Sequence, residues 1–415
     1  MRIALVVNLL QAAVLNATRS VLRQGRRTTL AAGAIGFGVA ALILAGGFIE
    51  WIFWAAREGT IQSGLGHVHI ARTGYFAGSS SGAERFMLAS DDPTLAKLKA
   101  DPAVRTVAPR LSFSGLASFG DTTISFFGEG VDPDAEGNFG EMSVIVAGDL
   151  LRSGSKAEVI VGQGLAANLG AKLGDTIVLL ANPPGGGVAA VEVRVRGLFA
   201  TVSKAYDDSV IRAPLPVAQQ LARANGAHRW VVVLKDTAMT TSMLAQLRQQ
   251  FAGQPLEFRP WYEMADFYNK TVDLLSRQMS VMFAIIGVII VLTISNSMMM
   301  SVMERTVEIG TAMALGTSRL GVLAQYLVEG AMLGVVGGVF GAVVGLTLAA
   351  IISWIGIPMP PPPGQAREFT AEMIVTVPLV LQSFALAATT ALVAAVYPAW
   401  KASRVPIVDA LRAGH

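Results

Sequence analysis

Cysteine is absent from the 415 residues, which excludes disulfide bonds, thiolate metal sites and a cysteine nucleophile. Charged residues are scarce as well. Asp, Glu, Lys and Arg make up 15% of the chain, compared with about 25% in ordinary globular proteins. The deficit is concentrated in four apolar stretches, each long enough to cross a bilayer. A cytosolic enzyme, a disordered chain and a secreted disulfide scaffold are therefore disfavoured.

Motifs for nucleotides and metals are also lacking. The dipeptide Gly-Lys does not occur, so the sequence holds no P-loop, and neither an H-E-x-x-H motif nor a zinc-binding spacing is present. The formal net charge of +3 gives no reason to expect nucleic-acid binding. We therefore expect no catalytic residue, metal ion or cofactor on this chain. Any ATP hydrolysis is expected to take place on a partner.

The first apolar stretch sets the expected topology. Residues 1–27 contain five Arg and no acidic residue, and no charge occurs from Thr28 to Ile49. Basic residues beside a span stay in the cytoplasm, so four spans place both termini there, and the tail with Lys401 and Arg404 fits. A cleaved signal peptide is the alternative. Its apolar region has about 7–15 residues, however, and this stretch has 22.

The pattern predicts an α-helical membrane protein with four transmembrane helices and a large α+β extracytoplasmic domain inserted between helices 1 and 2. In chain order we expect a cytoplasmic amphipathic N-terminal helix (1–27), the first span (28–53), the extracytoplasmic domain in two lobes (54–275), the second span (276–302), a short cytoplasmic helix (303–321), the third span (322–354), an outer Pro-rich loop (355–372), the fourth span (373–399) and a cytoplasmic tail (400–415).

Within the large insert, short β-type runs and helical patterns alternate too irregularly for a doubly wound sheet. The β-type runs are His67–Arg72, Glu158–Val161, Thr176–Leu180, Val191–Leu198 and Arg229–Leu234. The helical patterns are Thr94–Lys99, Gln163–Leu169, Leu215–Ala224 and Met239–Phe251.

Few polar residues in the insert suggest chemistry. His67 and His69 alternate along one strand and can act as two metal ligands on one face. No third ligand is near in the sequence, so packing or surface histidines are the preferred interpretation. Asp207 and Asp208 beside Lys204 form either an acidic site or a solvated turn, and we favour the turn.

The third span carries five glycines at helical spacing, Gly334, Gly337, Gly338, Gly341 and Gly345. Small residues four apart let two helices approach closely, either within one chain or between two copies. Glu329 lies inside the same span, where an ionisable residue is a functional candidate by default. Pairing with a cytoplasmic Arg and capping of a helix are the alternatives for Glu329.

Two cytoplasmic stretches carry a resemblance to a known family. The stretch from Ser301 to Arg319, SVMERTVEIGTAMALGTSR, resembles the E-R-x-x-E-I-G…A-x-G signature of the FtsX/MacB/LolC-LolE permeases, which are four-helix subunits of ABC transporters. The stretch from Pro398 to Arg412, PAWKASRVPIVDALR, is similar to the tail of that family. Glu158–Asp175 and Val195–Leu221 resemble its MacB-type periplasmic core domain. The family usually has an Arg near Ala312 or Met313, and this chain does not.

The resemblance implies roles for particular residues. It implies a coupling helix seated on an ABC ATPase, formed by Glu304, Arg305, Glu308, Ile309, Gly310, Ala314 and Gly316. It implies packing or dimer contacts through Asn296, Glu329 and the five glycines, and a C-terminal motif of Pro398, Pro406, Leu411 and Arg412. In an amphipathic helix here, Arg305 and Glu308 are exposed, and the apolar Ile309 and Met313 can press into a groove on the partner.

We therefore predict a permease subunit of the bacterial inner membrane that works by mechanotransmission and handles a lipoprotein, a lipid or an efflux substrate on the periplasmic side. Its expected partners are two copies of an ATPase that binds ATP and Mg²⁺, a second permease copy or paralogue, membrane lipids, and a periplasmic lipoprotein carrier or adaptor. The alternative is an FtsX-like signalling subunit that activates a periplasmic cell-wall hydrolase without transport. A ligand sensor is less well supported, because the sequence shows no output module.

Overall fold

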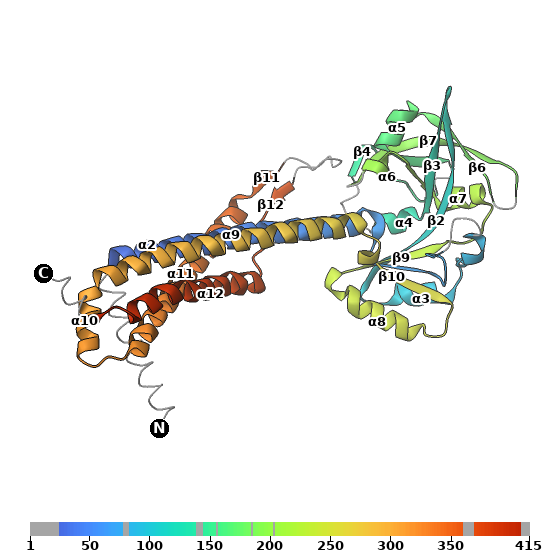
Figure 1. Ribbon diagram of the computed structural model, residues 1–415. Helices are drawn as coiled ribbons and strands as arrows, with labels where there is room; N and C mark the ends of the chain where they lie inside the picture. The colour runs from blue at the N-terminus through green and yellow to red at the C-terminus, as the bar shows by residue number, and fades with distance from the viewer. Residues whose placement is uncertain are drawn as a thin grey trace. The chain divides into compact units, whose positions relative to one another are not determined.

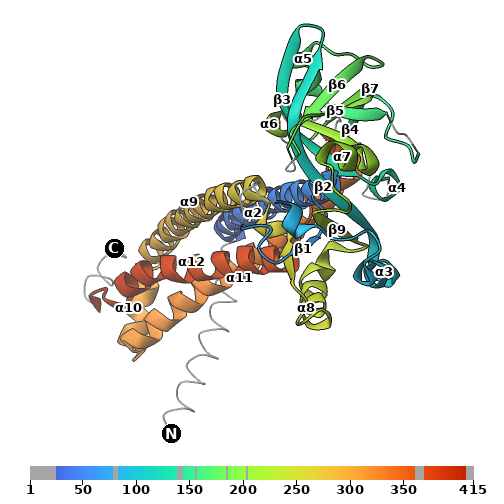
Figure 2. The ribbon, with the colours of Figure 1, turned by 90° about the vertical axis from the view of Figure 1, so that its right-hand side faces the viewer.

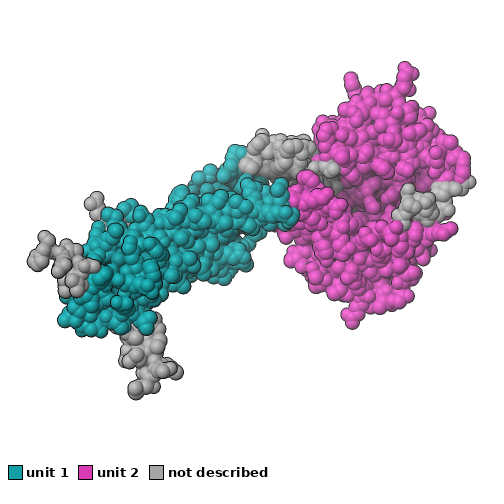
Figure 3. All heavy atoms as spheres, viewed as in Figure 1, with its two compact units in different colours: residues 1–53, 272–358, 370–415 teal, residues 54–271, 359–369 magenta. Residues whose placement is uncertain are grey.

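The computed structural model describes residues 25–77, 83–137, 144–154, 157–183, 186–201, 204–359 and 369–407. These residues belong to two compact units, which Figure 3 colours separately. The helical unit comprises residues 1–53, 272–358 and 370–415, and the mixed unit comprises residues 54–271 and 359–369. Nearly all of the helix predicted over 1–27, and the Pro-rich part of the loop at 355–372, lie outside the described residues.

Four long helices form most of the helical unit: α2 (Gly25–Thr60), α9 (Asp266–Glu304), α11 (Arg319–Ile355) and α12 (Val377–Ser403). All four are long and apolar enough to cross a membrane. The short helix α10 (Thr306–Ala314) connects α9 to α11, as Figure 1 shows. A two-stranded sheet of β11 (Ile357–Met359) and β12 (Phe369–Ala371) precedes α12.

Two of these helices extend beyond the predicted spans. α9 begins at Asp266 rather than at 276, and α2 continues to Thr60 rather than ending at 53. The reason is that helical structure does not stop where the apolar stretch stops. Both helices therefore begin in one unit and end in the other. After α2 the chain makes a turn of π-helix, Ile61–Leu65, in which Gly64 has a φ of 129° that favours glycine.

Ten strands of the mixed unit form one sheet in the order β10-β1-β9-β2-β3-β8-β5-β7-β4, and β6 pairs with β2 and β7. Only β3–β8 and β5–β7 are parallel among the described pairs, which makes the unit α+β rather than doubly wound. The strands are β1 (Val68–Arg72), β2 (Val104–Phe119), β3 (Thr122–Val131), β4 (Val144–Gly148), β5 (Glu158–Gly162), β6 (Thr176–Ala181), β7 (Ala189–Ala200), β8 (Val210–Pro214), β9 (Arg229–Leu234) and β10 (Leu256–Pro260).

Short helices cover the sheet. They are η2 (Ala83–Phe86), α3 (Pro93–Ala100), α4 (Pro133–Glu136), α5 (Gln163–Leu169), α6 (Lys204–Asp207), α7 (Leu215–Ala222), η3 (Thr237–Met239), α8 (Thr240–Gln250) and η4 (Trp261–Glu263). The two largest hydrophobic clusters of the unit lie between these helices and the sheet. One gathers β1, β9, α3 and α8 around Trp230, and the other gathers β5, β7, α5 and α7 around Leu165. Strand β2 runs through both lobes, because it pairs with β9 at its start and with β3 and β6 further on. Figure 2 shows its length.

The sequence pattern did not predict β2, β3, β4, β8 or β10. Three of them carry charged residues at inward positions, and these interrupt the apolar alternation that marks a strand. Arg110 on β2 and Arg212 on β8 are buried, and the Glu129 side chain on β3 is 14% exposed. Pro109 lies within β2, and a proline in a sequence argues against a central strand. The two predicted lobes are therefore two halves of one continuous sheet.

The glycines of α11 bring backbones together inside the chain. A Cβ added at Gly341 would lie 2.4 Å from the Gly36 carbonyl oxygen, and one added at Gly337 would lie 2.7 Å from Cβ of Ile35, both on α2. On the other side, a Cβ at Gly334 would lie 2.6 Å from Cβ of Ala391 on α12. The remaining two behave in the same way, since Gly338 faces Phe384 and Gly345 faces Ala40.

These contacts correspond to the first of the two predicted alternatives, packing within one chain. All five glycines are buried against α2 or α12 of the same chain. Close approach replaces side-chain contacts with dispersion contacts between backbones, which is the effect expected of small residues in membrane helices. The exposed apolar residues of the unit lie elsewhere, notably on α9, where Val281, Ile285, Val288 and Leu292 are all more than half exposed.

Gly341→Ala should destabilise the protein because its new methyl group clashes with the backbone of α2. We expect a loss of about 1–3 kcal/mol, the usual cost of overpacking, measured as a lower unfolding temperature in detergent. Gly33→Ala on α2 is the matched control, since no atom lies within 4 Å of a Cβ there. Equal unfolding temperatures for the two variants would show that α11 does not contact α2 in this way.

Candidate functional site

The segment from Ser301 to Arg319 folds as a short helix between two sharp ends. Arg305 interrupts the helical geometry at the end of α9, and α10 follows at once. α10 ends at Ala314, and two residues later Gly316 has a φ of 103° that favours glycine and donates its amide to the Met313 carbonyl at 3.1 Å. Ser318 then begins α11 by accepting a hydrogen bond from the Gly321 amide at 3.1 Å. The second glycine of the signature, Gly316, thus lies in the turn between α10 and α11.

α10 has a buried side and an exposed side. Ile309 and Met313 are 7% and 9% exposed and belong to the same hydrophobic cluster as Val302, Val322 and Ala402, which come from α9, α11 and α12. The residues at the exposed positions are Glu304, Val307, Glu308, Thr311, Ala314 and Leu315. They recur every three or four residues, so they form one stripe along the helix.

This arrangement corrects the predicted orientation of the segment. Ile309 and Gly310 are buried in the core of the chain itself, so they seat α10 and cannot enter a groove of a partner. Glu304 and Glu308 are exposed, as predicted for Glu308, whereas Arg305 is only partly exposed and its side chain hydrogen-bonds Tyr326 of α11. The exposed side of α10 thus carries Glu308 and is followed by the apolar Leu315, which is 85% exposed.

The other predicted residues of the helical unit lie outside α10. Glu329 is buried on α11, one turn after Tyr326, while Asn296 is exposed on α9. Asn296 borders a shallow pocket of about 340 Å³ with Met300 and Glu304. Pro398 is buried inside α12 and Pro406 is exposed after it. The positions of Leu411 and Arg412 lie outside the described residues.

A buried cluster of charges lies where the two lobes of the mixed unit meet. The Glu129 carboxylate of β3 accepts hydrogen bonds from Arg110 of β2 at 2.6 Å, from Arg229 of β9 at 2.8 Å and from the Tyr206 hydroxyl at 2.8 Å. Arg212 of β8 lies 3.6 Å from the same carboxylate. The cluster therefore joins four strands around one acidic group.

The pKa values of the cluster follow from burial and charge. Burial alone raises the pKa of Glu129, but the guanidinium groups of Arg110, Arg229 and Arg212 outweigh it and lower the pKa to about 2. Burial raises the pKa of Tyr206 to about 12. Glu129 therefore stays ionised and Tyr206 stays neutral at ordinary pH, which keeps the hydrogen bonds intact.

The cluster also contacts the turn that follows α2. Arg110 donates to the Gly64 carbonyl at 3.3 Å and pairs with Glu136 of α4 at 2.6 Å. A Cβ at Gly64 would lie 2.7 Å from the Arg212 guanidinium. None of these residues was predicted from the sequence to belong to a site. Charged residues at inward positions of strands would have indicated this cluster. Those positions can be assigned only when the strands are known, and β2, β3 and β8 were not predicted.

His67 and His69 are buried and serve the fold. The Leu234 amide donates to Nδ1 of His67 at 3.0 Å, so the proton is on Nε2, which donates to the Thr237 hydroxyl at 3.0 Å. His69 hydrogen-bonds the Leu65 carbonyl through Nε2. Among the described residues no group of three His, Asp or Glu is placed to hold a metal ion. Asp207 is buried against Thr201 instead of lying in a solvated turn, and Asp208 pairs with Lys204 at 3.0 Å.

The comparisons with known proteins agree with this architecture. The family model of the MacB-like periplasmic core domain matches residues 28–250, and that of the FtsX-like permease C-terminal matches residues 280–407. A lipoprotein-releasing system transmembrane protein LolC from Xylella fastidiosa is 24% identical over 342 residues, 75% of this chain and 78% of that protein. A macrolide export ATP-binding/permease protein MacB from Syntrophobacter fumaroxidans is 29% identical over 208 residues, 48% of this chain. The matched part spans only 27% of that MacB.

Among solved structures, the periplasmic region of MacB from Actinobacillus actinomycetemcomitans matches with a TM-score of 0.35 and 14% identity, over 51% of this chain and 94% of that one. The four apolar helices together with the two matching family models define a multi-pass membrane protein of the ABC permease class. Within that class, the chain belongs to the FtsX/MacB/LolC family of ABC transporter permeases.

Ile309→Ala tests whether Ile309 seats α10. We expect a loss of stability of about 2–4 kcal/mol, because a buried side chain is removed from a cluster that spans five helices. Leu315→Ala should leave the unfolding temperature unchanged, since that side chain is exposed. If Leu315→Ala destabilised the isolated chain as much as Ile309→Ala, the assignment of the two faces would be wrong.

The buried histidines should make stability depend on pH. Burial lowers the pKa of His67 to about 4 and that of His69 to about 3. The unfolded chain, with a histidine pKa of about 6.5, binds more protons between pH 6.5 and 4, so stability falls as the pH drops through this range. For His67 alone the loss is up to about 3 kcal/mol. Melting curves from pH 7.5 to 4.5 should show this decline, and His67→Gln should make it shallower. An unchanged slope would contradict the assignment.

Proposed function

We propose that this chain is the membrane subunit of an ABC transporter that works by mechanotransmission. The observation that carries the proposal is the division of α10 into two faces. The buried side joins α9, α11 and α12 in one hydrophobic cluster, and the exposed side presents Glu304, Val307, Glu308 and Leu315. A displacement imposed on the exposed stripe therefore moves the whole helical unit, because close-packed interiors transmit strain rather than absorb it.

The partner on this stripe is an ABC ATPase that binds ATP and Mg²⁺, in two copies. The support is the absence of Gly-Lys from the 415 residues together with the membership of a permease family. The MacB relative is itself named an ATP-binding/permease protein, so its name joins both activities. The exposed acidic residues Glu304 and Glu308 suit a basic groove on the ATPase, and Leu315 suits an apolar pocket within it.

The mixed unit is proposed to lie in the periplasm, between the first and second spans of the inner membrane, with both termini in the cytoplasm. The five Arg before the first span support this orientation. α2 and α9 each connect the two units without a break in the helix, so a movement of either helix is passed on to the mixed unit. In the mixed unit, the movement of α2 is passed to the turn at Gly64 and, through the hydrogen bond from Arg110, to the charge cluster around Glu129.

The substrate class is proposed to be a lipoprotein or another lipid-anchored molecule, taken up from the periplasmic side. The relative that aligns with three quarters of this chain is named a lipoprotein-releasing system protein, which supports this choice over an efflux substrate. A second permease, identical or paralogous, completes the complex, and a periplasmic carrier or adaptor accepts the substrate. An FtsX-like subunit that activates a cell-wall hydrolase uses the same coupling helix, and it differs in that nothing is released.

Glu308→Arg should uncouple the chain from its ATPase. Reversing the charge places a cation against the proposed basic groove of the ATPase, where like charges repel. We expect the stimulated ATPase activity to fall at least about tenfold, equivalent to about 1.4 kcal/mol or more. The complex is purified with its ATPase in nanodiscs, and both ATP hydrolysis and release of a lipid-anchored reporter are measured.

Glu372→Arg is the matched control, because Glu372 is also exposed and lies beyond α11, on the side of the membrane away from α10 in the proposed topology. It should leave the ATPase activity unchanged. ATP hydrolysis by the purified chain alone would contradict the proposal. Coupled hydrolysis without release of any lipid-anchored reporter would favour the signalling subunit over the transporter.

A further inference from the structure

A cavity of about 480 Å³ lies in the mixed unit, between the last turns of α2 and the segment that follows β9. Its volume is within the roughly 300–1,000 Å³ of ordinary ligand sites. Five charged residues line it, Arg57, Glu58, Arg105, Lys235 and Asp236. The cavity lining thus carries charges of both signs. The hydrogen bonds and ion pairs within the protein determine which of these charged groups can contact a ligand.

The two acidic groups are already engaged by the protein. The Glu58 carboxylate accepts from the Thr237 hydroxyl at 2.9 Å and from Gln62 at 3.2 Å, and it pairs with Arg57 at 3.2 Å. Asp236 accepts from the Ala238 amide at 2.9 Å, as the N-cap of η3. Both carboxylates are therefore held by donors of the chain itself.

The cations Arg105 and Lys235 are not engaged in the same way. Both are exposed, and within the described ranges neither side chain forms an ion pair. They are brought together by the sheet, because Val104 pairs with Leu234 across β2 and β9, and the Lys235 amide donates to the Ala103 carbonyl at 3.0 Å. Two neighbouring cations that line one cavity attract an anion with several acceptor oxygens.

The position of the cavity along α2 points to the source of that anion. The uncharged run of 22 residues that ends at Ile49 is about 33 Å long, enough to cross the roughly 30 Å hydrocarbon core. Arg57 lies about 12 Å further along the same helix axis. Trp54 and Tyr262, which are 44% and 37% exposed, also line the cavity. Aromatic rings beside basic residues, just beyond an apolar span, are typical of the head-group layer.

We propose that this cavity binds the phosphate group of a membrane phospholipid, with Arg105 and Lys235 as its main donors and Trp54 and Tyr262 against the glycerol part. Arg57 is oriented by its contact with Glu58 and adds a third cation. The site does not depend on an ATPase, so its test is separate from that of the proposed function.

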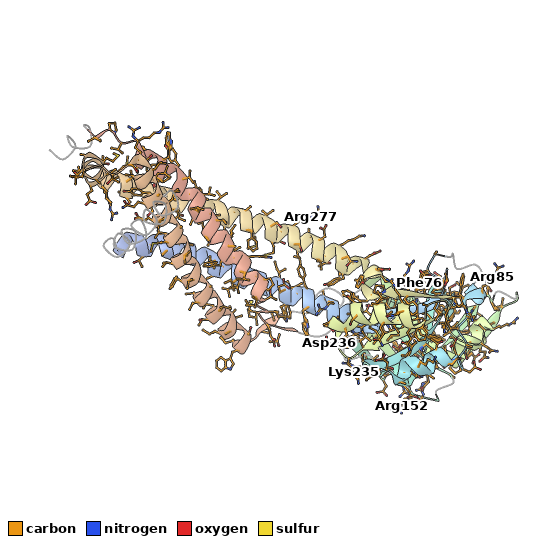
Figure 4. All side chains as sticks on the ribbon, turned by 90° about the horizontal axis from the view of Figure 1, so that it is seen from below. Phe76, Arg85, Arg152, Lys235, Asp236 and Arg277 are labelled. Carbon is orange, nitrogen blue, oxygen red and sulfur yellow. The ribbon has the colours of Figure 1, made fainter. Side chains whose placement is uncertain are left out.

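Figure 4 shows Lys235 and Asp236 next to each other, and Arg85, which serves as a control below, at a different place on the unit.

The experiment measures retention of phosphatidylglycerol by the full-length chain in detergent, followed by native mass spectrometry across a lipid titration. The double variant R105Q/K235Q should bind the lipid roughly tenfold more weakly for each cation removed, because each loses a charge-assisted hydrogen bond. Arg85→Gln with Lys99→Gln removes the same two charges from exposed positions that do not line the cavity, and it should bind like the wild type. Melting temperatures of both double variants establish that they fold.

Two further ligands identify the chemistry. Diacylglycerol has the acyl chains without the phosphate and should be retained no better by the wild type than by R105Q/K235Q. Soluble glycerol phosphate should bind more weakly than the phospholipid, and Trp54→Ala should weaken only the phospholipid. Equal lipid binding by wild type and R105Q/K235Q, or equal loss in the control variant, would overturn the proposal. Binding of glycerol phosphate as tight as that of the lipid would assign the site to a soluble phosphate and overturn the lipid as its source.

Discussion

The Glu129 carboxylate ties the two lobes of the mixed unit together, because it is a largely buried anion that strands of both lobes share. Arg110 and Arg229 contact it from β2 and β9, and Arg212 approaches it from β8. Removing one member of a buried ion pair typically costs about 3–5 kcal/mol, since the charges left behind lose their partner. The two halves of the sheet therefore keep a fixed relation at this point, and the turn at Gly64 is fixed with them.

The helical unit is held together by close contacts between helix backbones rather than by ion pairs. Gly337, Gly341 and Gly345 bring α11 against α2, and Gly334 brings it against α12. α10 completes the same cluster through its buried side. The two units are thus held together by different interactions: dispersion contacts between backbones in one, and a desolvated ionic network in the other.

Part of the candidate site was predictable from residues alone. The signature from Glu304 to Gly316 covers the segment that contains α10, but the positive φ of Gly316 just after that helix was not predicted. The orientation of α10 was not predictable. An amphipathic pattern states that one side is apolar, but it does not state whether the chain itself or a partner covers that side. The structure buries Ile309 and Met313 within the chain and leaves Glu308 and Leu315 exposed.

The sequence by itself determined the number of apolar helices, the existence of a large α+β insert and the family, because span length, charge deficit and local motifs are properties of consecutive residues. Only the tertiary structure decided which residues meet. It placed Arg110, Glu129 and Arg229 in one cluster although up to 119 positions separate them, and it brought Arg57 and Lys235 to one cavity. These pairings depend on strand register and on the order of strands in the sheet. Neither is encoded in any local pattern, since charged residues on a strand look solvent-facing until their neighbours are known.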